Sequence, residues 1–252
     1  MNTEERRACI EELIKEKKEL DVNFIKDRFS VSSVTVRNDL MYLERKGVVK
    51  RLFGKAVLRD DRISGGFDPD EVENLEFKEK IGKFAATLIE ENDSIMLYTG
   101  TTTMQVARQL DESKSIIAVT NSIYIAHELR RFSRVKPVLI GGNLSVDTGA
   151  TYGVQAIKQL EQYNIDKLFL SLDGIDADSG ITNNHPYETD LNFAPIQAAR
   201  QIIVIADQSK IGATHFVHMG SIEDVDILVT DTKAPADKIE AIRAKGVTVY
   251  QV

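Results

Sequence analysis

The residue types and spacings that most clearly suggest a chemical role lie in residues 31–57, VSSVTVRNDLMYLERKGVVKRLFGKAV. Within this stretch, Val34, Arg37 and Asn38 stand close together, with Thr35 beside them. Arginine can bridge a guanine edge, asparagine an adenine edge, and a small apolar side chain can contact a thymine methyl group. We therefore expect these residues to contact bases in the major groove of DNA.

A helix that begins after Ser32 would present these side chains together. Serine is a favoured N-cap because its hydroxyl accepts a hydrogen bond from a free amide of the first turn. Val36, Leu40 and Leu43 follow at spacings of four and three, which places them on one inward face. At about 100° per residue, the opposite face then carries the base-reading residues.

A basic hairpin is predicted directly after this helix. Gly47 follows two basic residues and suits a left-handed helix end. The residues after it predict two short strands with a turn near Gly54. Lys50, Arg51 and Lys55 lie on this hairpin, and we expect them to contact the phosphate backbone.

Two amphipathic segments, at about residues 4–17 and 22–29, precede this helix. Their apolar residues recur at helical spacing and should face inward: Ile10, Leu13, Ile14, Val22, Ile25 and Phe29. Three helices followed by a hairpin make a winged helix-turn-helix, which we predict over residues 1–58 as a DNA-binding domain.

Charge distribution separates this prediction from that of an ordinary helical domain with a solvated basic surface. Residues 22–59 contain nine Lys or Arg and three acids, a net charge of +6. Residues 60–252 contain eighteen basic and twenty-nine acidic residues, a net charge of −11, and the whole chain carries −7. A basic island in an acidic protein is typical of a nucleic-acid contact surface.

Composition indicates an intracellular globular protein. The sequence has no apolar run near eighteen residues, and its charged N-terminus does not resemble a signal peptide. Its single cysteine cannot form an internal disulfide, and its four histidines do not cluster with it. We therefore expect a cytoplasmic location, no membrane partner, no metal site and no cofactor.

The rest of the chain predicts an α/β domain. Residues 59–74 are acidic, contain glycine and proline, and are predicted to be a linker. Residues 75–252 then alternate helical segments with short apolar runs, as central parallel strands do. The runs are 94–98, 116–120, 135–142, 166–172, 201–207, 226–231 and 247–252.

Ligands of open parallel sheets bind beyond the carboxyl ends of the strands. The residues that follow the predicted strands are rich in hydroxyl, amide, glycine and charged groups. Individually these are common in turns, but together they predict a site for a phosphorylated small molecule. The candidate residues are Thr99, Gly100, Thr101, Thr102, Asn121, Gly141, Gly142, Asp173 and Lys210.

Nearly the whole chain resembles the DeoR family of bacterial transcriptional regulators. The resemblance lies in residues 31–57 and in the ordered motifs TGTTT, VTNS, GG, DGI, GIT with a following Glu, and D-x-SK-x-G. It implies a sensor domain similar to ribose-5-phosphate isomerase and a sugar-phosphate effector that relieves repression of carbohydrate-use genes. It also implies DNA contacts at Ser33, Thr35, Arg37 and Asn38.

The sequence departs from the family pattern at several positions. The family usually has a second arginine at Asn38, which suggests a preference shifted toward adenine. It usually has His-Gly-Gly-Ala at 53–56, where this chain has Phe-Gly-Lys-Ala. It usually has aspartate at Tyr98, so a carboxylate that would bond sugar hydroxyls is absent and a different effector or weaker binding is expected.

Three functions follow from these features. The leading one is a sequence-specific repressor that binds operator DNA as a homo-oligomer, since helix-turn-helix dimers bind paired half-sites. The alternative is a sugar-phosphate isomerase with an added helical domain, which would use Asp173 or Glu188 as a base and Lys210 as an oxyanion stabiliser. A non-specific architectural protein fits less well, because the larger domain is acidic.

Overall fold

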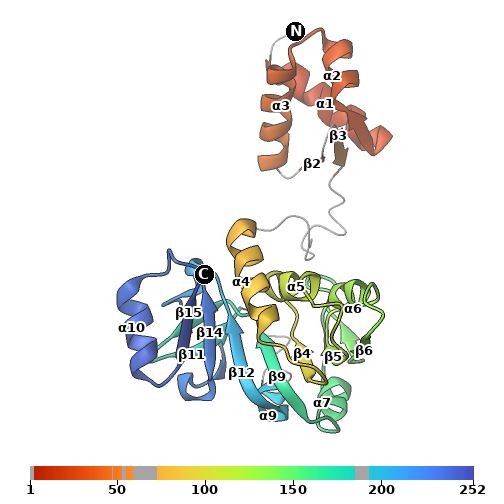
Figure 1. Cartoon of the computed structure of the whole chain (residues 1–252). Helices are drawn as coiled ribbons and strands as arrows, with labels where there is room; N and C mark the ends of the chain where they lie inside the picture. Colours follow the sequence, from red (N-terminus) through yellow and green to blue (C-terminus); the bar gives the residue numbers. More distant parts are fainter. Residues whose placement is uncertain (1–2, 47, 53–54, 59–72, 185–192) are drawn as a thin grey trace. The chain divides into compact units, whose positions relative to one another are not determined.

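The computed structural model describes residues 3–46, 48–52, 55–58, 73–184 and 193–252 (Figure 1). The chain forms two compact units, residues 1–65 and 66–252. Most of the predicted linker, residues 59–72, lies outside the described residues. Within the described ranges, no helix is long and apolar enough to cross a membrane, and no cluster of metal-binding side chains occurs.

The smaller unit is the predicted winged helix-turn-helix. Its helices are α1 (Thr3–Lys17), α2 (Val22–Phe29) and α3 (Ser33–Arg45), and its wing consists of β2 (Val49–Leu52) and β3 (Lys55–Leu58). A short strand that was not predicted, β1 (Glu19–Asp21), pairs with β3 and gives the sheet order β1-β3-β2. The predicted turn residues Gly47 and Gly54 lie outside the described residues.

Helix ends and apolar faces explain why this unit folds. Ser32 caps α3, as predicted, by accepting a hydrogen bond from the Thr35 amide at 3.2 Å. Asp21 caps α2 through the Asn23 and Phe24 amides. The inward residues of all three helices then form one core with the wing, whose buried members include Ile10, Ile14, Ile25, Val36, Leu40, Leu43, Val49 and Ala56.

The larger unit is built on a seven-stranded sheet whose neighbouring strands are all parallel. All seven apolar runs predicted from the sequence form its strands. In the order β15-β14-β12-β9-β4-β5-β6, they are Thr248–Gln251, Ile227–Thr230, Ala199–Ile205, Ile165–Leu170, Ser94–Leu97, Ile116–Thr120 and Val135–Leu139. The predicted open, mainly parallel α/β architecture is confirmed.

Helices and small sheets surround this sheet. The helices are α4 (Leu75–Thr87), α5 (Thr101–Arg108), α6 (Ile123–Leu129), α7 (Val154–Leu160), α9 (Ala194–Ala198) and α10 (Ala236–Ala244), with short 3-10 turns at Gln208–Lys210 and Ile222–Asp224. One antiparallel sheet contains β10 (Gly174–Asp176), β11 (Gly180–Asn183) and β13 (Val217–Gly220). A hairpin contains β7 (Asn143–Leu144) and β8 (Thr151–Tyr152).

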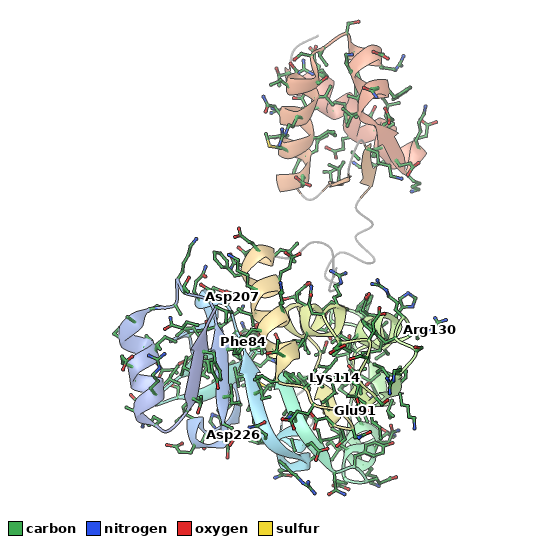
Figure 2. The ribbon with its side chains drawn as sticks, in the orientation of Figure 1. Phe84, Glu91, Lys114, Arg130, Asp207 and Asp226 are labelled. Atoms are coloured by element: carbon green, nitrogen blue, oxygen red, sulfur yellow. The ribbon has the colours of Figure 1, made fainter. Side chains whose placement is uncertain are left out.

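Alternation along the strands divides the interior into two apolar layers. Ile95 and Leu97 of β4 face a layer with α4, α5 and α6, whereas Met96 points into the layer that contains residues of α7, α10 and the β10-β11-β13 sheet. Side chains fill the space on both sides of the sheet (Figure 2). Because both faces are buried, the strands are almost continuously apolar, and polar residues concentrate at their ends.

Candidate functional site

The exposed face of α3 presents the residues predicted to contact DNA bases. Ser33, Arg37 and Asn38 are exposed, and Val34 retains 68% of its accessible surface. A small apolar side chain at this position can contact a thymine methyl group. Thr35 is only half-exposed, and its hydroxyl lies 2.9 Å from the Ser32 hydroxyl, so it takes part in the helix cap.

A buried aspartate on the opposite face of α3 was not identified from the sequence. Asp39 is 1% exposed and accepts hydrogen bonds from Arg6 Nε at 2.6 Å and Arg7 Nε at 2.8 Å. The Arg7 guanidinium also lies over the Tyr42 ring, 4.1 Å from its centroid. The two arginines neutralise the acid and fix α1 against α3, so the negative charge of Asp39 does not face the surface predicted to contact DNA.

The wing is described in part. Lys55 is partly exposed, and its Nζ lies 2.7 Å from Glu19 Oε2 on β1. A contact with phosphate would therefore replace an existing surface ion pair, which is a weak interaction. The backbones of Lys50 and Arg51 lie in β2, while the positions of their side chains fall outside the description.

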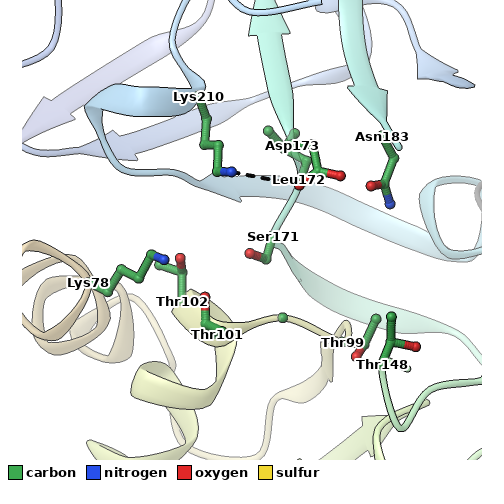
Figure 3. A pocket seen from close by; sticks show the side chains of 11 residues that line it. Lys78, Thr99, Thr101, Thr102, Thr148, Ser171, Leu172, Asp173, Asn183 and Lys210 are labelled. Carbon is green, nitrogen blue, oxygen red and sulfur yellow. Dashed lines mark ion pairs between the residues drawn. The ribbon is translucent and has the colours of Figure 1, made fainter. Parts of the chain in front are cut away.

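The larger unit has a cavity of about 190 Å³ at the point where the sheet order reverses. From β4 the chain continues to β5 and β6 on one side, whereas from β9 it continues to β12, β14 and β15 on the other. The loops that follow β4 and β9 border the cavity, as expected for a topological switch point. Its lining comprises Lys78, Thr99, Gly100, Thr101, Thr102, Thr148, Ser171, Leu172, Asp173, Asn183 and Lys210 (Figure 3).

Six of the nine predicted effector residues line this cavity: Thr99, Gly100, Thr101, Thr102, Asp173 and Lys210. The other three lie outside its lining. Asn121 is completely buried, and its Oδ1 accepts a hydrogen bond from the Thr99 amide at 2.9 Å, so it positions the loop after β4. The Gly141 amide donates to Gln159 Oε1 at 2.9 Å, and Gly142 packs against the Tyr152 carbonyl.

Five lining residues were missed in the sequence: Lys78, Thr148, Ser171, Leu172 and Asn183. Ser171 and Leu172 directly precede the predicted Asp173, so inspection of the whole strand end would have included them. Thr148 and Asn183 come from the loop between β7 and β8 and from β11, which the sequence did not predict. Lys78 lies on α4, and only its place among the apolar positions of that helix signals burial.

Two lysine–aspartate ion pairs border the cavity. Lys210 Nζ lies 3.7 Å from Asp173 Oδ1, and Lys78 Nζ lies 3.6 Å from Asp207 Oδ2 (Figure 3 shows the first pair). Both distances exceed those of ordinary hydrogen bonds. The lysines are therefore attracted to their carboxylates while keeping N–H groups for a further acceptor, since each ammonium has three.

Burial affects the pKa values of Lys78 and Asp207. The Lys78 side chain is 9% exposed, and desolvation lowers the pKa of its ammonium, although the charge of Asp207 opposes this effect. Burial favours the protonated form of Asp207, but hydrogen bonds from the Ser209 hydroxyl and amide and two nearby lysines outweigh it and hold the pKa of Asp207 below its ordinary value. The charged form of Asp207 is therefore favoured, and its charge offsets part of the burial cost of the Lys78 ammonium.

Tyr98 does not line the cavity. It is buried in the apolar layer with Met96 and Leu168. The substitution of the family's usual aspartate therefore places an aromatic side chain in the core. Glu188, the other candidate base of the isomerase alternative, lies outside the described residues.

The arrangement around the cavity suits a small, hydroxylated anion. Threonine and serine hydroxyls and an asparagine amide supply hydrogen bonds, and two ammonium groups supply positive charge. The Thr99 hydroxyl is buried without a hydrogen-bond partner among the described residues.

Comparison with known proteins gives matches over most of the chain. A DeoR-like helix-turn-helix domain matches residues 6–62, and a DeoR C terminal sensor domain matches residues 73–232. A putative aga operon transcriptional repressor from Escherichia coli O157:H7 is 32% identical, with 99% of this chain and 94% of the relative covered. The HTH-type transcriptional regulator GlpR from Haloferax volcanii is 35% identical, with 97% and 96% covered.

Among solved structures, a ribose 5-phosphate isomerase A from Methanocaldococcus jannaschii is similar to this chain. It has 19% sequence identity, a TM-score of 0.41, and coverage of 55% of each chain.

Proposed function

The chain belongs to the DeoR family of transcriptional regulators, and on this premise we propose that it represses a carbohydrate-utilisation operon and is released by a phosphorylated sugar or related metabolite. Its relatives are named regulators and repressors, and the chain is accordingly a DNA-binding regulator and not an enzyme. The proposal rests on the combination of two features in one chain. These are an exposed recognition helix and a cavity bordered by Lys78 and Lys210.

Operator binding is tested by gel shift of the full chain on its own upstream DNA across a salt series. A specific complex should bind this DNA more tightly than random duplex, and its affinity should fall as salt rises, because lysines and arginines displace counterions from phosphates. Equal affinity for both duplexes, without dependence on salt, would refute the proposal.

Arg37→Ala should weaken operator binding by roughly 5- to 150-fold, because a good arginine–guanine contact contributes about 1–3 kcal/mol of discrimination. Arg37 is exposed on α3, so the substitution should leave the melting temperature nearly unchanged. Fluorescence anisotropy with operator and random duplexes measures both affinities.

Arg130→Ala is the matched control, because it removes one exposed arginine from the larger unit. It should leave operator affinity unchanged. If Arg37→Ala weakens operator and random duplex by the same factor, Arg37 contacts phosphate and does not read a base.

We propose that the effector is a phosphorylated sugar because the cavity combines ammonium groups with several hydroxyls. A phosphate would be bound by Lys78 and Lys210, and sugar hydroxyls by Thr99, Ser171 or Asp173. A thermal-shift screen of sugar phosphates identifies the ligand, since a compound that binds only the folded protein raises the melting temperature.

Lys210→Ala should leave operator affinity intact and abolish release by the effector found in that screen. Loss of a charged hydrogen bond costs about 1.5–3 kcal/mol, which corresponds to roughly 10- to 150-fold in effector affinity. Titration calorimetry measures effector binding, and anisotropy measures operator release.

Lys238→Ala provides the control for this experiment. Lys238 pairs with Asp176 at 3.2 Å but does not line the cavity, so effector affinity should be retained. Loss of operator binding in Lys210→Ala would instead indicate that Lys210 has a structural role.

We further propose that the regulator acts as a homo-oligomer in the cytoplasm. Two recognition helices on one duplex would bind paired half-sites, and the affinity of the pair exceeds that of one helix. Sedimentation of the full chain with and without operator measures the stoichiometry. A single protomer per operator would refute the proposed homo-oligomer.

A further inference from the structure

Asp207, labelled in Figure 2, contacts both the start of α4 and the loop that carries Lys210. Its Oδ1 accepts hydrogen bonds from the Ser209 amide and hydroxyl, one residue before the cavity-lining Lys210. The same oxygen accepts a hydrogen bond from Asn74 Nδ2 at 3.2 Å, and Oδ2 lies 3.6 Å from Lys78 Nζ. Asn74 and Lys78 are one turn apart on α4, so a single carboxylate holds that turn at two points.

Asn74 occupies an unusual position for a helix cap. It is the N-cap of α4, and its backbone is left-handed, with φ 61° and ψ 30°. A capping asparagine usually accepts a hydrogen bond from an amide of the first turn, whereas this side chain makes no such bond and donates to Asp207. The first turn is therefore anchored to the loop that carries Lys210.

Both cavity lysines are already paired with carboxylates before any ligand binds. Among the described residues, Lys78 pairs with Asp207 and Lys210 pairs with Asp173. Within the described residues, no donor lies within hydrogen-bonding distance of the buried Oδ2 of Asp207, although Lys78 is near. An anion in the cavity would therefore attract the Lys78 ammonium in competition with Asp207, even though the ammonium has donors for both.

We propose that the Asn74–Asp207–Lys78 cluster is the coupling through which an anionic effector acts on the start of α4. This inference rests on the effector proposed above. As the anion draws Lys78 toward the cavity, the turn shared with Asn74 moves, and the Asn74–Asp207 hydrogen bond is strained or lost. The first turn of α4 then loosens at the place where the chain arrives from residues 59–72, the connection to the DNA-binding unit.

The test uses the full chain with inorganic phosphate as the anionic probe, against sodium chloride at equal ionic strength. Hydrogen exchange is measured at the Phe77 and Lys78 amides, which both donate to the Asn74 carbonyl at 3.1 Å. In the unsubstituted protein, phosphate should speed their exchange roughly 2- to 10-fold, the range expected when a hydrogen bond of about 0.5–1.5 kcal/mol is lost.

Asn74→Gly removes the side-chain link while preserving the left-handed backbone, which glycine adopts without strain. These amides should exchange rapidly even without phosphate and should not respond to it. Phosphate should bind roughly 2- to 10-fold more tightly, because its binding no longer has to break the Asn74–Asp207 hydrogen bond. Asn92→Gly is the matched control, since Asn92 is also a left-handed asparagine, with φ 67°, in the turn before β4. It should respond as the unsubstituted protein does.

Asp207→Asn tests the competition itself. Asparagine can still accept the Ser209 bond, but the competing charge is gone, so phosphate should bind about tenfold more tightly. Unchanged or weaker phosphate binding in a variant that remains folded would refute the proposed competition between the anion and Asp207.

The two proposals fail differently. If phosphate binds and the Asn74→Gly variant responds like the unsubstituted chain, the coupling is wrong and the effector site stands. If phosphate does not bind the unsubstituted chain, the anionic effector site is wrong and the coupling falls with it.

Discussion

Asp39→Ala should destabilise the winged helix-turn-helix unit by about 3–5 kcal/mol and abolish operator binding. The substitution removes a carboxylate that receives both Arg6 and Arg7 and leaves the Arg6 guanidinium buried without its partner. A small domain has a free energy of unfolding of about 5–15 kcal/mol, so the loss takes a large part of it. Urea unfolding followed by circular dichroism measures the change, and anisotropy measures operator binding.

Asp27→Ala is the control for this prediction. Asp27 is an exposed acid on α2, and its replacement should change stability by no more than about 0.5 kcal/mol. Both variants gain one unit of net positive charge, so a charge effect alone would make them equal. Equal urea midpoints for the two variants would show that the buried pairing of Asp39 does not hold α1 to α3.

Much of the fold was predictable because it depends on local patterns. The spacing of Val36, Leu40 and Leu43 and the N-cap at Ser32 place the recognition helix, and the apolar runs place all seven parallel strands. Parallel strands bring their carboxyl ends to one edge, so residues as distant as Thr99 and Lys210 were expected to meet, and they line one cavity.

The features that were missed depend on contacts between distant residues. Asp39 was counted as one of three acids in a basic island, but its partners lie 33 and 32 positions away on α1. Strand β1 has only three residues and is stabilised by pairing with β3. Such contacts leave no periodic trace in a single sequence.

The residues in and around the cavity show the same limit of prediction from sequence. The side-chain amide of Asn121 could in principle bind a ligand. It is fully buried, however, and accepts a hydrogen bond from the Thr99 backbone amide. Lys78 looks like a solvated charge in FKEKIGK, yet it is buried and lines the cavity. Residue type predicted the chemistry of this region, but only packing decides which side chain faces a ligand and which supports it.

Gly100→Ala should strongly disrupt the larger unit. Gly100 has a backbone φ of 154°, which residues other than glycine rarely adopt. An added Cβ would lie 2.4 Å from Ser171 Cβ and 2.6 Å from Ser171 Oγ. Backbone strain of about 1–3 kcal/mol adds to an overpacking cost of about 1–3 kcal/mol. Because Gly100 and Ser171 both line the cavity, relief of this clash should also separate the loops after β4 and β9 and abolish effector binding.

Gly246→Ala separates the effect of backbone strain from the effect of overpacking. Gly246 also has a left-handed backbone, with φ 96°, but an added Cβ would meet no atom within 4 Å. This variant should lose only the strain energy, about 1–3 kcal/mol, and should bind the effector normally. Denaturant unfolding and calorimetry of both variants measure the two effects. Equal destabilisation with effector binding retained in both would mean that the two loops do not depend on close contact at Gly100 to form the site.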